Sequence, residues 1–409
     1  MSAKDGIVHL WNLSENEVFV KLSDNTQKTM VEKALEFFKN EDELARVLGT
    51  DQATVNEFKW SKHQSVNLEF VKRLCTFLCE KEITEFSLEN IEKQIELIKT
   101  KVGFGIKNPK FPMNFNNKEG AQIISGFLFD GGIRKSLTPF YVNNEECLIK
   151  KLINNLEKVV GKVYYVRYSQ REITYFIDFS RILGIILNSG LGIPTGKKVF
   201  TNPSVPEFIL NRNKEVQKAF LQQAFDDEAT VNLGQAHGRG RRIRLNQNHS
   251  IDVAPIRLSQ LKEMLENLGI SVTGPFKERT LYNKRGYTSY GWAIEITNQS
   301  DISTFAKEVN FGLDAKKQKL QTLLNSYVLP PRFKKGTKFN EVLRACKELK
   351  DKNQRLTNKS IAKQLKKAES YTRRLTLKMV KEGKLKIVKE RVNLGGYEGA
   401  TKKEFDLIR

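Results

Sequence analysis

Residues 220–231 read Phe-Leu-Gln-Gln-Ala-Phe-Asp-Asp-Glu-Ala-Thr-Val, an apolar segment that runs into three consecutive acids. About a hundred positions earlier, residues 121–133 read Ala-Gln-Ile-Ile-Ser-Gly-Phe-Leu-Phe-Asp-Gly-Gly-Ile and also end on an acid. Both segments are too apolar to face water, so we predict two buried helices. A buried carboxylate is costly without a partner, and carboxylate oxygens suit a hard divalent cation. Packed side by side, the helices would bring Asp130 near Glu228 and form a divalent-cation site.

The order of predicted elements after each acidic helix also repeats with this period. Each copy reads as an acidic helix, a strand region, an amphipathic helix, two strands and a helix, and this order of elements carries the repeat without any need for sequence identity. Neither copy alone could bury its acidic helix, so we expect one α+β unit with a pseudo-two-fold axis. Its halves are predicted at residues 105–212 and 213–328.

The charge balance points to a polyanionic partner. The 409 residues carry a formal net charge of +22, which suggests nucleic acid first and an anionic membrane second. No apolar run reaches the roughly 18 to 20 residues that span a bilayer, and no signal pattern opens the chain. We therefore expect a soluble, cytoplasmic and nucleoid-associated protein. The four cysteines fit a reducing compartment, and none has zinc-ligand spacing with a histidine.

Residues 1–104 contain a pattern that is typical of a helix-turn-helix. A small residue at Ala45, a turn glycine at Gly49 and an apolar anchor at Val55 have the spacing of two closely packed helices. An ordinary helical hairpin would show the same pattern. If the unit binds DNA, its second helix is the one offered to the major groove. The candidate contact residues on this helix are Gln52, Thr54 and Asn56.

Residues 329–409 form the most basic part of the chain. Positions 331–409 hold 24 Lys and Arg against 9 Asp and Glu, so this segment supplies 24 − 9 = +15 of the charge. Two helices followed by two alternating strands predict a winged helix. Surface lysines are normally interspersed with acids, so this excess favours nucleic-acid contact over a merely solvated face. The candidate contacts are Arg373, Arg374 and Lys378.

Over residues 105–326 the two-copy pattern resembles the LAGLIDADG homing-endonuclease family, including the endonuclease domains embedded in inteins. The resemblance implies two αββαββα halves with saddle-shaped sheets. It places Glu228 on the family's metal-binding acid and Asp226 on the earlier acid that supports the helix end. Gln223 and Ala229 stand where the family usually has glycine. Because small residues there let the motif helices touch, Gln223 is expected to push them apart.

The first copy can be aligned with the family motif in two frames. Anchoring on Asp130 places that residue at the metal acid and Ser125 at the small contact position. Anchoring on Gly126 and Gly132 instead leaves Gly131 at the metal position. The first frame is preferred because its Asp-Gly ending is like that of the intein-type motifs.

The segment 192–198, ahead of Val205-Pro206, resembles the family's block that brings a lysine into the active site. Lys198, with Lys197 as the alternate, would stabilise charge on the phosphate, although a surface lysine would fit the residues equally well. The implied cofactor is Mg²⁺ or another divalent cation. The resemblance thus implies a catalytic set made of Asp130, Glu228 and Lys198.

The predicted sheets would lie in the major groove of duplex DNA, with alternate side chains facing bases or phosphates. A one-residue slip would reverse the faces, so the parity of the contacts is left open. The candidate contacts on the sheets are Arg239, Arg241, Arg242, Arg244, Arg167 and Arg171.

Three functions fit these patterns. A site-specific, Mg²⁺-dependent endonuclease that cuts both strands as a pseudo-symmetric monomer is favoured by Asp130 and Glu228. The predicted helix-turn-helix and winged helix on either side of the central unit favour a non-cleaving DNA-binding regulator. Such a protein would be similar to sporulation-type regulators with a degenerate LAGLIDADG unit. RNA binding, as in maturases of the family, is the third. Met1 and Arg409 are not splicing residues, so the pattern also predicts a free-standing protein.

Overall fold

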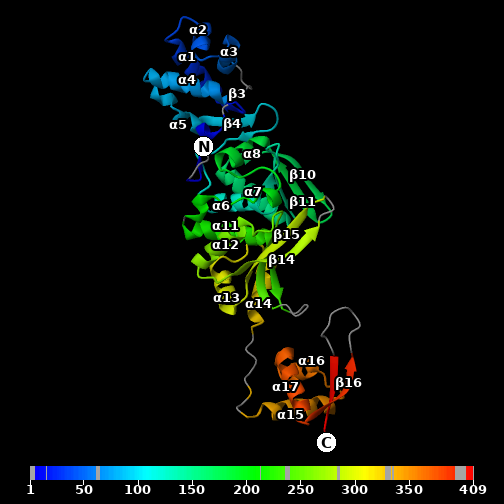
Figure 1. Cartoon of the computed structure of the whole chain (residues 1–409). Helices are drawn as coiled ribbons and strands as arrows, with labels where there is room; N and C mark the ends of the chain where they lie inside the picture. The colour runs from blue at the N-terminus through cyan, green and yellow to red at the C-terminus, as the bar shows by residue number, and fades with distance from the viewer. Residues whose placement is uncertain are drawn as a thin grey trace. The chain divides into compact units, whose positions relative to one another are not determined.

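The computed structural model describes residues 5–14, 16–60, 65–211, 213–234, 240–282, 286–327, 333, 336–391 and 402–408. The fold is α+β, with helices and several antiparallel sheets (Figure 1). The chain divides into two compact units, Met1–Ser326 and Tyr327–Arg409. Within the described part of the chain, no helix has the length and apolar character needed to cross a bilayer.

The first half of the central region has the predicted order of elements. Its four-stranded antiparallel sheet has the order β10-β11-β8-β7. The helix after the last strand continues as a π-helical turn, Ile186–Gly190. In chain order, the elements are α6 (Lys118–Leu128), β7 (Gly131–Ile133), β8 (Pro139–Asn143), α7 (Glu146–Val159), β10 (Tyr165–Arg171), β11 (Thr174–Phe179) and α8 (Arg181–Ile185).

The second half repeats this topology. Its sheet has the order β12-β13-β15-β14, which is the first sheet's order written from the other edge. The agreement confirms the predicted repeat, because both halves place their first and second strands beside each other and their fourth strand next to the second. The elements are α11 (Lys214–Glu228), β12 (Ala229–Leu233), β13 (Arg241–His249), α12 (Ile256–Asn267), β14 (Thr273–Tyr282), β15 (Thr288–Ile296) and α13 (Gln299–Glu308).

The two apolar helices α6 and α11 pack directly against each other (Figure 1). Ser125 Oγ donates a hydrogen bond of 2.9 Å to the carbonyl oxygen of Phe220, so the helices approach closely at the serine. The expectation that Gln223 separates them is wrong. Its buried side chain is accommodated at the interface, where its Nε2 donates to Asp227 Oδ1 at 2.9 Å and lies 3.3 Å from Tyr141 Oη of the first half.

Three short segments connect or follow the halves and carry residues of the site. Helices α9 (Lys198–Thr201) and α10 (Glu207–Leu210) follow the repeated elements of the first half and precede α11. Helix α14 (Asp314–Asn325) follows α13 and lies against β12. Each of them therefore reaches the central region from outside the two repeats.

The N-terminal region shares a sheet with the central region. A five-stranded sheet has the order β3-β2-β4-β5-β9, and β9 comes from the first half. The predicted boundary at residue 104 therefore falls inside this sheet. Its strands are β2 (Val18–Leu22), β3 (Val66–Asn67), β4 (Ile95–Thr100), β5 (Ile106–Lys107) and β9 (Lys162–Val163), and a further pair joins β1 (Ile7–Val8) to β6 (Met113–Asn114).

Four main helices accompany that sheet, and two of them occupy the predicted helix-turn-helix. Gly49 lies in the turn with φ of 63°, a conformation that glycine adopts without strain. Val55 is fully buried, and Ala45 is 1% exposed. These helices are α1 (Asp24–Leu35), α2 (Glu41–Val47), α3 (Gln52–Trp60) and α4 (Leu68–Glu80), followed by a short α5 (Leu88–Ile91).

In the described residues of the second unit, three helices accompany a two-stranded antiparallel hairpin. An isolated antiparallel β-bridge pairs Thr357, the residue that caps the start of α16, with Glu404 of the hairpin. The buried core includes Val342, Ile361 and Met379, none of which is exposed. The elements are α15 (Lys338–Asp351), α16 (Asn358–Gln364), α17 (Glu369–Lys381), β16 (Leu385–Arg391) and β17 (Lys402–Leu407).

Candidate functional site

The two motif acids lie at the ends of the paired helices. Glu228 is the last residue of α11, and Asp130 follows the end of α6 by two positions. The pKa of the Asp130 carboxyl is raised from its usual 3.8 to about 6. Burial is the larger cause of this shift, and the nearby charge of Glu228 is the second. Burial also raises the pKa of Glu228. The charge of Glu228 thus acts on the Asp130 carboxyl, whereas Gly131, the metal position of the alternative frame, begins β7.

Three cations from outside the motif helices face these acids. Lys198 lies in α9, Arg257 in α12 and Lys316 in α14. The charges of all three oppose the rise in the pKa of Glu228. The helix ends are thus a place where buried acids and buried bases neutralise one another.

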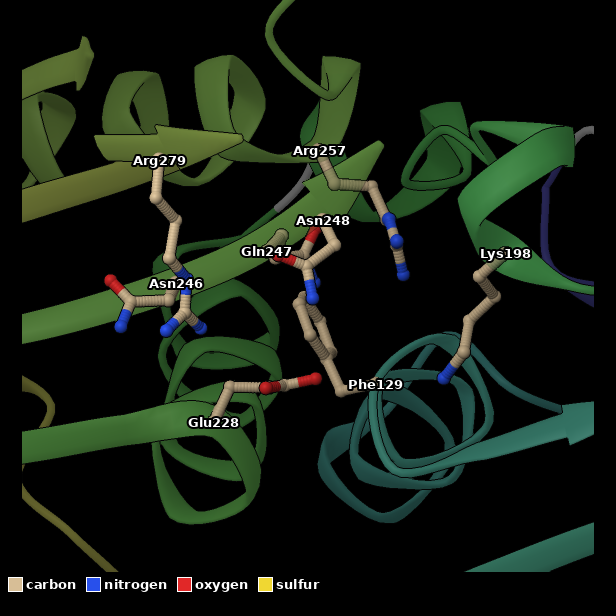
Figure 2. Close-up of a pocket in the computed structure, with 8 residues that line it drawn as sticks. All are labelled: Phe129, Lys198, Glu228, Asn246, Gln247, Asn248, Arg257 and Arg279. Atoms are coloured by element: carbon tan, nitrogen blue, oxygen red, sulfur yellow. The ribbon is translucent and has the colours of Figure 1, made fainter. Parts of the chain in front are cut away.

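A cavity of about 250 Å³ opens beside Glu228. Figure 2 shows Glu228, Lys198 and Arg257 pointing into the same space, with Arg279 and Asn246 at its other side. The cavity is lined by one acid, three basic side chains and three side-chain amides. The basic groups can bind a phosphate, and the amides can form hydrogen bonds with a nucleobase. The residues that line it are Phe129, Lys198, Glu228, Asn246, Gln247, Asn248, Arg257 and Arg279.

Burial disfavours the charged forms of the basic side chains in this cavity. It lowers the pKa of Lys198 to about 8, and the nearby Arg257 lowers it as well, while Glu228 and Asp130 oppose the change. Burial also lowers the pKa of Arg257 to about 10. Lys197, the alternate to Lys198, is exposed instead and stands over the rings of Phe200 and Tyr287 at 6.0 and 5.9 Å. Of the two lysines, Lys198 is therefore the one that lines the cavity.

Asp226, the expected supporting acid, lies near the end of α11 and is hydrogen-bonded to the segment before α14. Its carboxylate accepts hydrogen bonds from the backbone N–H groups of Gly312 and Leu313 at 2.9 to 3.0 Å. Lys151 Nζ of α7 lies 3.7 Å from its Oδ2. Asp226 thus joins α11 to the segment that leads into α14, and to a helix of the other half.

Asp227 is a third acid that sequence reasoning passed over. Burial raises its pKa well above the usual value, and the charge of Asp130 adds to the effect. Tyr141 Oη donates to Asp227 Oδ1 at 2.6 Å, whereas Oδ2 is buried and has no hydrogen-bond partner among the residues that the structure describes. A buried, unpartnered carboxylate oxygen beside two further acids marks a site that gains from a proton or a cation.

The donor set fits a magnesium-type cation. The described residues hold no group of three or more His, Cys, Asp and Glu side chains arranged around a metal position. Mg²⁺ does not need such a cage, since it keeps several waters and binds through one or two carboxylates together with substrate phosphates. Asp130 and Glu228 supply two carboxylates of the required type, each destabilised by burial.

The raised pKa of Asp130 predicts a pH-dependent stability. Folded Asp130 keeps its proton up to about pH 6, whereas the unfolded chain releases it near its usual 3.8. The stability from this residue is therefore fully present below about pH 4 and is lost as pH rises to about 6, by about 3 kcal/mol. Denaturant unfolding in EDTA should show the wild type losing stability relative to Asp130→Asn across this range. A constant difference between the two would contradict the burial of this carboxyl.

The predicted arginines on the second sheet are engaged within the protein. Arg242 Nη1 lies 2.6 Å from Glu295, and Arg244, 7% exposed, pairs with Glu278 at 2.5 Å and with Glu295 at 3.4 Å. Their strand does turn them away from the core, because Ile243 and Leu245 are fully buried. Their charges are nevertheless neutralised by Glu295 of the neighbouring strand β15 and Glu278 of β14, the strand beyond it.

The other two arginines predicted as DNA contacts in the second half are Arg241 and Arg239. Arg241 donates to Ser326 Oγ at 2.7 Å and to its carbonyl oxygen at 2.9 Å, so it holds the C-terminal end of α14. Arg239 lies outside the described residues.

The first sheet presents Arg167 and Arg171 on one exposed face. Arg167 pairs across the strands with Asp178 and Arg171 with Thr174, while the intervening Tyr168 pairs with Ile177, which is fully buried. The helices therefore cover the face of Ile177, and the two arginines lie on the other. Their parity, left open by the sequence, is decided by this register.

The terminal candidates lie on helix surfaces. Gln52 is exposed on α3, and Thr54 and Asn56 are half-buried on the same helix. The three basic candidates on α17 are all exposed, because the buried face of that helix is formed by Thr372, Leu375, Thr376 and Met379. The exposed residues are Arg373, Arg374 and Lys378.

Lys316 could have been found from spacing. It follows the first residue of α13, Gln299, by 17 positions, and Lys198 follows the first residue of α8, Arg181, by the same 17 (316 − 299 and 198 − 181). Its Nζ donates to the carbonyl oxygen of Phe225 at 3.1 Å and also to the backbone carbonyl oxygen of Asp226. Arg257 carried no comparable signal, because its contact with Leu128 O comes from the packing of α12 against α6.

Comparisons with known proteins give structural neighbours only. No protein-family model and no curated protein sequence matches the chain. Full-length DUF199/WhiA from Thermatoga maritima is similar at 11% identity and a TM-score of 0.36, covering 69% of this chain and 93% of that one. The homing endonuclease I-DmoI in complex with DNA and Mn is similar at 18% identity and a TM-score of 0.31, covering 48% and 98%. The neighbours thus include a LAGLIDADG-type endonuclease and WhiA, at similarities that assign the chain to neither.

Proposed function

We propose that residues 105–328 bind duplex DNA and hydrolyse its phosphodiester bonds with a divalent cation held by Asp130 and Glu228. The observation that carries the proposal is that these two acids lie at the ends of the paired helices α6 and α11, where the charge of Glu228 acts on Asp130, and that Glu228 lines a cavity with Lys198 and Arg257. When bound, a cation of the magnesium type would lower the pKa of a bound water and stabilise charge on the phosphate.

The side chains of the site would hold the cation and contact the phosphate and the adjacent bases. Asp130 and Glu228, one from each half, hold the cation near the two strands. Lys198 donates hydrogen bonds to a phosphate oxygen where negative charge develops, and partial burial strengthens that interaction. Asn246, Asn248 and Arg279 line the cavity from the second sheet and can reach polar edges of bases next to the reacting phosphate.

Exposed basic residues outside the cavity supply candidate phosphate contacts. On the first sheet these are Arg167 and Arg171, and in the second unit Arg373, Arg374 and Lys378. Arg242 and Arg244 are less suited to this role because glutamates already neutralise them. The α3 residues Gln52, Thr54 and Asn56 are candidate base contacts of a helix-turn-helix.

The test is metal-dependent cleavage of a library of duplexes by the full chain, beginning with the locus that encodes it. Cleavage in Mg²⁺ or Mn²⁺ that stops in EDTA is the expected result. Sequence-specific binding without cleavage in any of these metals would favour a DNA-binding regulator. The capping of the α11 carbonyls by Lys316 favours that second function, since it neutralises the helix end without a metal. Preferential binding of RNA would contradict both.

A further inference from the structure

A chain of hydrogen bonds connects Asp130 of the first half to Asp227 of the second. Asn143 Nδ2 donates to Asp130 Oδ2 at 2.6 Å and lies 3.4 Å from Tyr141 Oη. Tyr141 Oη donates to Asp227 Oδ1 at 2.6 Å. Gln223 Nε2, one helical turn before Asp227, donates to the same oxygen at 2.9 Å. The chain therefore begins at a proposed cation ligand and ends on the other motif helix.

The amide of Asn143 is held in one orientation. Its Oδ1 accepts a hydrogen bond of 2.9 Å from the backbone N–H of Glu145, so its Nδ2 must point the other way. There it meets both Asp130 and Tyr141. A flipped amide would present an oxygen to the Asp130 carboxylate and lose the bond from Glu145, so this orientation is strongly preferred.

The position of Tyr141 is fixed by burial. Its side chain is fully buried on β8, opposite Ile177 of β11, and Asn143 is two residues further along the same face of β8. The hydroxyl has a carboxylate acceptor, and hydrogen bonds to charged or polarised acceptors are among the stronger ones in proteins. Asp227 therefore anchors Tyr141, and Tyr141 in turn limits where the Asn143 amide can lie.

Orientation matters for Asp130 because the terminal torsion of an aspartate is soft, with a broad range of populated angles. A cation ligand must present an oxygen in one direction. Hydrogen-bond partners of metal ligands supply that restraint, and their loss typically costs about 10- to 100-fold in metal affinity or activity.

We propose that Asn143, held by Tyr141 and Asp227, is the positioning residue that directs the Asp130 carboxylate toward a divalent cation. The inference rests on the proposed function in that the cation site is the one described above. Its consequence is that the first-half ligand depends on an acid of the second half, so that the cation site is complete only when α6 and α11 are paired.

The experiment is an Mn²⁺ titration of the full chain without DNA, followed by electron paramagnetic resonance of the free ion. Asn143→Ala should weaken Mn²⁺ binding by about 10- to 100-fold. Tyr141→Phe keeps the buried ring and should weaken binding less, but measurably. Tyr168→Phe is the matched control, since its hydroxyl also donates to a carboxylate, Glu146 at 2.9 Å, in the same half but outside the site; it should bind as the wild type does.

The outcomes separate this inference from the proposed function. Wild-type Mn²⁺ affinity in both Asn143→Ala and Tyr141→Phe overturns the positioning role. A wild-type chain that binds no Mn²⁺ overturns the cation site and the positioning role together. Mn²⁺ binding without DNA cleavage removes only the nuclease function. If Asn143→Ala does not fold, as judged by its thermal unfolding, Tyr141→Phe decides the question alone.

Discussion

Asp130→Asn and Glu228→Gln should each abolish cleavage of a duplex that the wild type cuts, while duplex affinity stays within about twofold. Each substitution removes the charge of one cation ligand and keeps its shape. Loss of a single group that stabilises the transition state electrostatically costs about 10²- to 10³-fold, and loss of the cation itself costs more. The measurement is single-turnover cleavage with saturating enzyme in Mg²⁺, with affinity determined separately in Ca²⁺ or without metal.

Glu215→Gln is the matched control for this experiment. Glu215 lies in the first turn of the same helix as Glu228, its side chain is 74% exposed, and it pairs with Lys218 at 2.9 Å. It should cleave at the wild-type rate. Cleavage that persists in both Asp130→Asn and Glu228→Gln would remove the cation site from the mechanism. Loss of binding together with cleavage would show that the acids are structural.

Duplex affinity should fall steeply with salt. A protein with a net charge of +22 that neutralises six to ten phosphates is expected to lose about 10³- to 10⁵-fold in affinity between 50 and 200 mM salt. The measurement is the slope of log K against log salt concentration, taken by fluorescence anisotropy. A flat response would contradict phosphate contact as the source of affinity.

The triple variant Arg373→Ala, Arg374→Ala and Lys378→Ala tests the second unit within the same measurement. Each lost phosphate contact should reduce the slope by about 1. Arg344→Ala is the control, because Arg344 is also an exposed basic residue of that unit but lies on α15 and not on α17. An unchanged slope in the triple variant would exclude α17 from the DNA interface.

Local patterns were sufficient to predict most of the architecture. The apolar spacing of residues 121–128 and 220–225 predicts two buried helices, and the repeated order of elements predicts two halves of one topology. These features follow from burial and periodicity, which each segment carries in its own residues. The same holds for the amphipathic α17, whose basic face is visible from the spacing of its buried residues.

Electrostatic partners were not predictable in the same way. Arg242 and Arg244 look free in the sequence, yet Glu295 and Glu278 arrive from strands more than thirty positions away and neutralise them. Gln223 looks like a spacer between helices, but its length lets it reach Asp227 instead. Strand register and helix packing bring such pairs together, and neither is encoded in local spacing.

The sequence by itself determined that two apolar helices end in acids, that the halves repeat and that the chain is strongly basic, because composition and period are local properties. Only the tertiary structure decided that Lys198 rather than Lys197 lines the cavity, that Arg257 joins it, and that Tyr141 and Asn143 connect Asp227 to Asp130. The reason is physical. A carboxylate's protonation and orientation depend on whatever surrounds it in space, and the neighbours of Asp130 and Glu228 come from separate segments of the chain, among them α9, α12, α14 and β8.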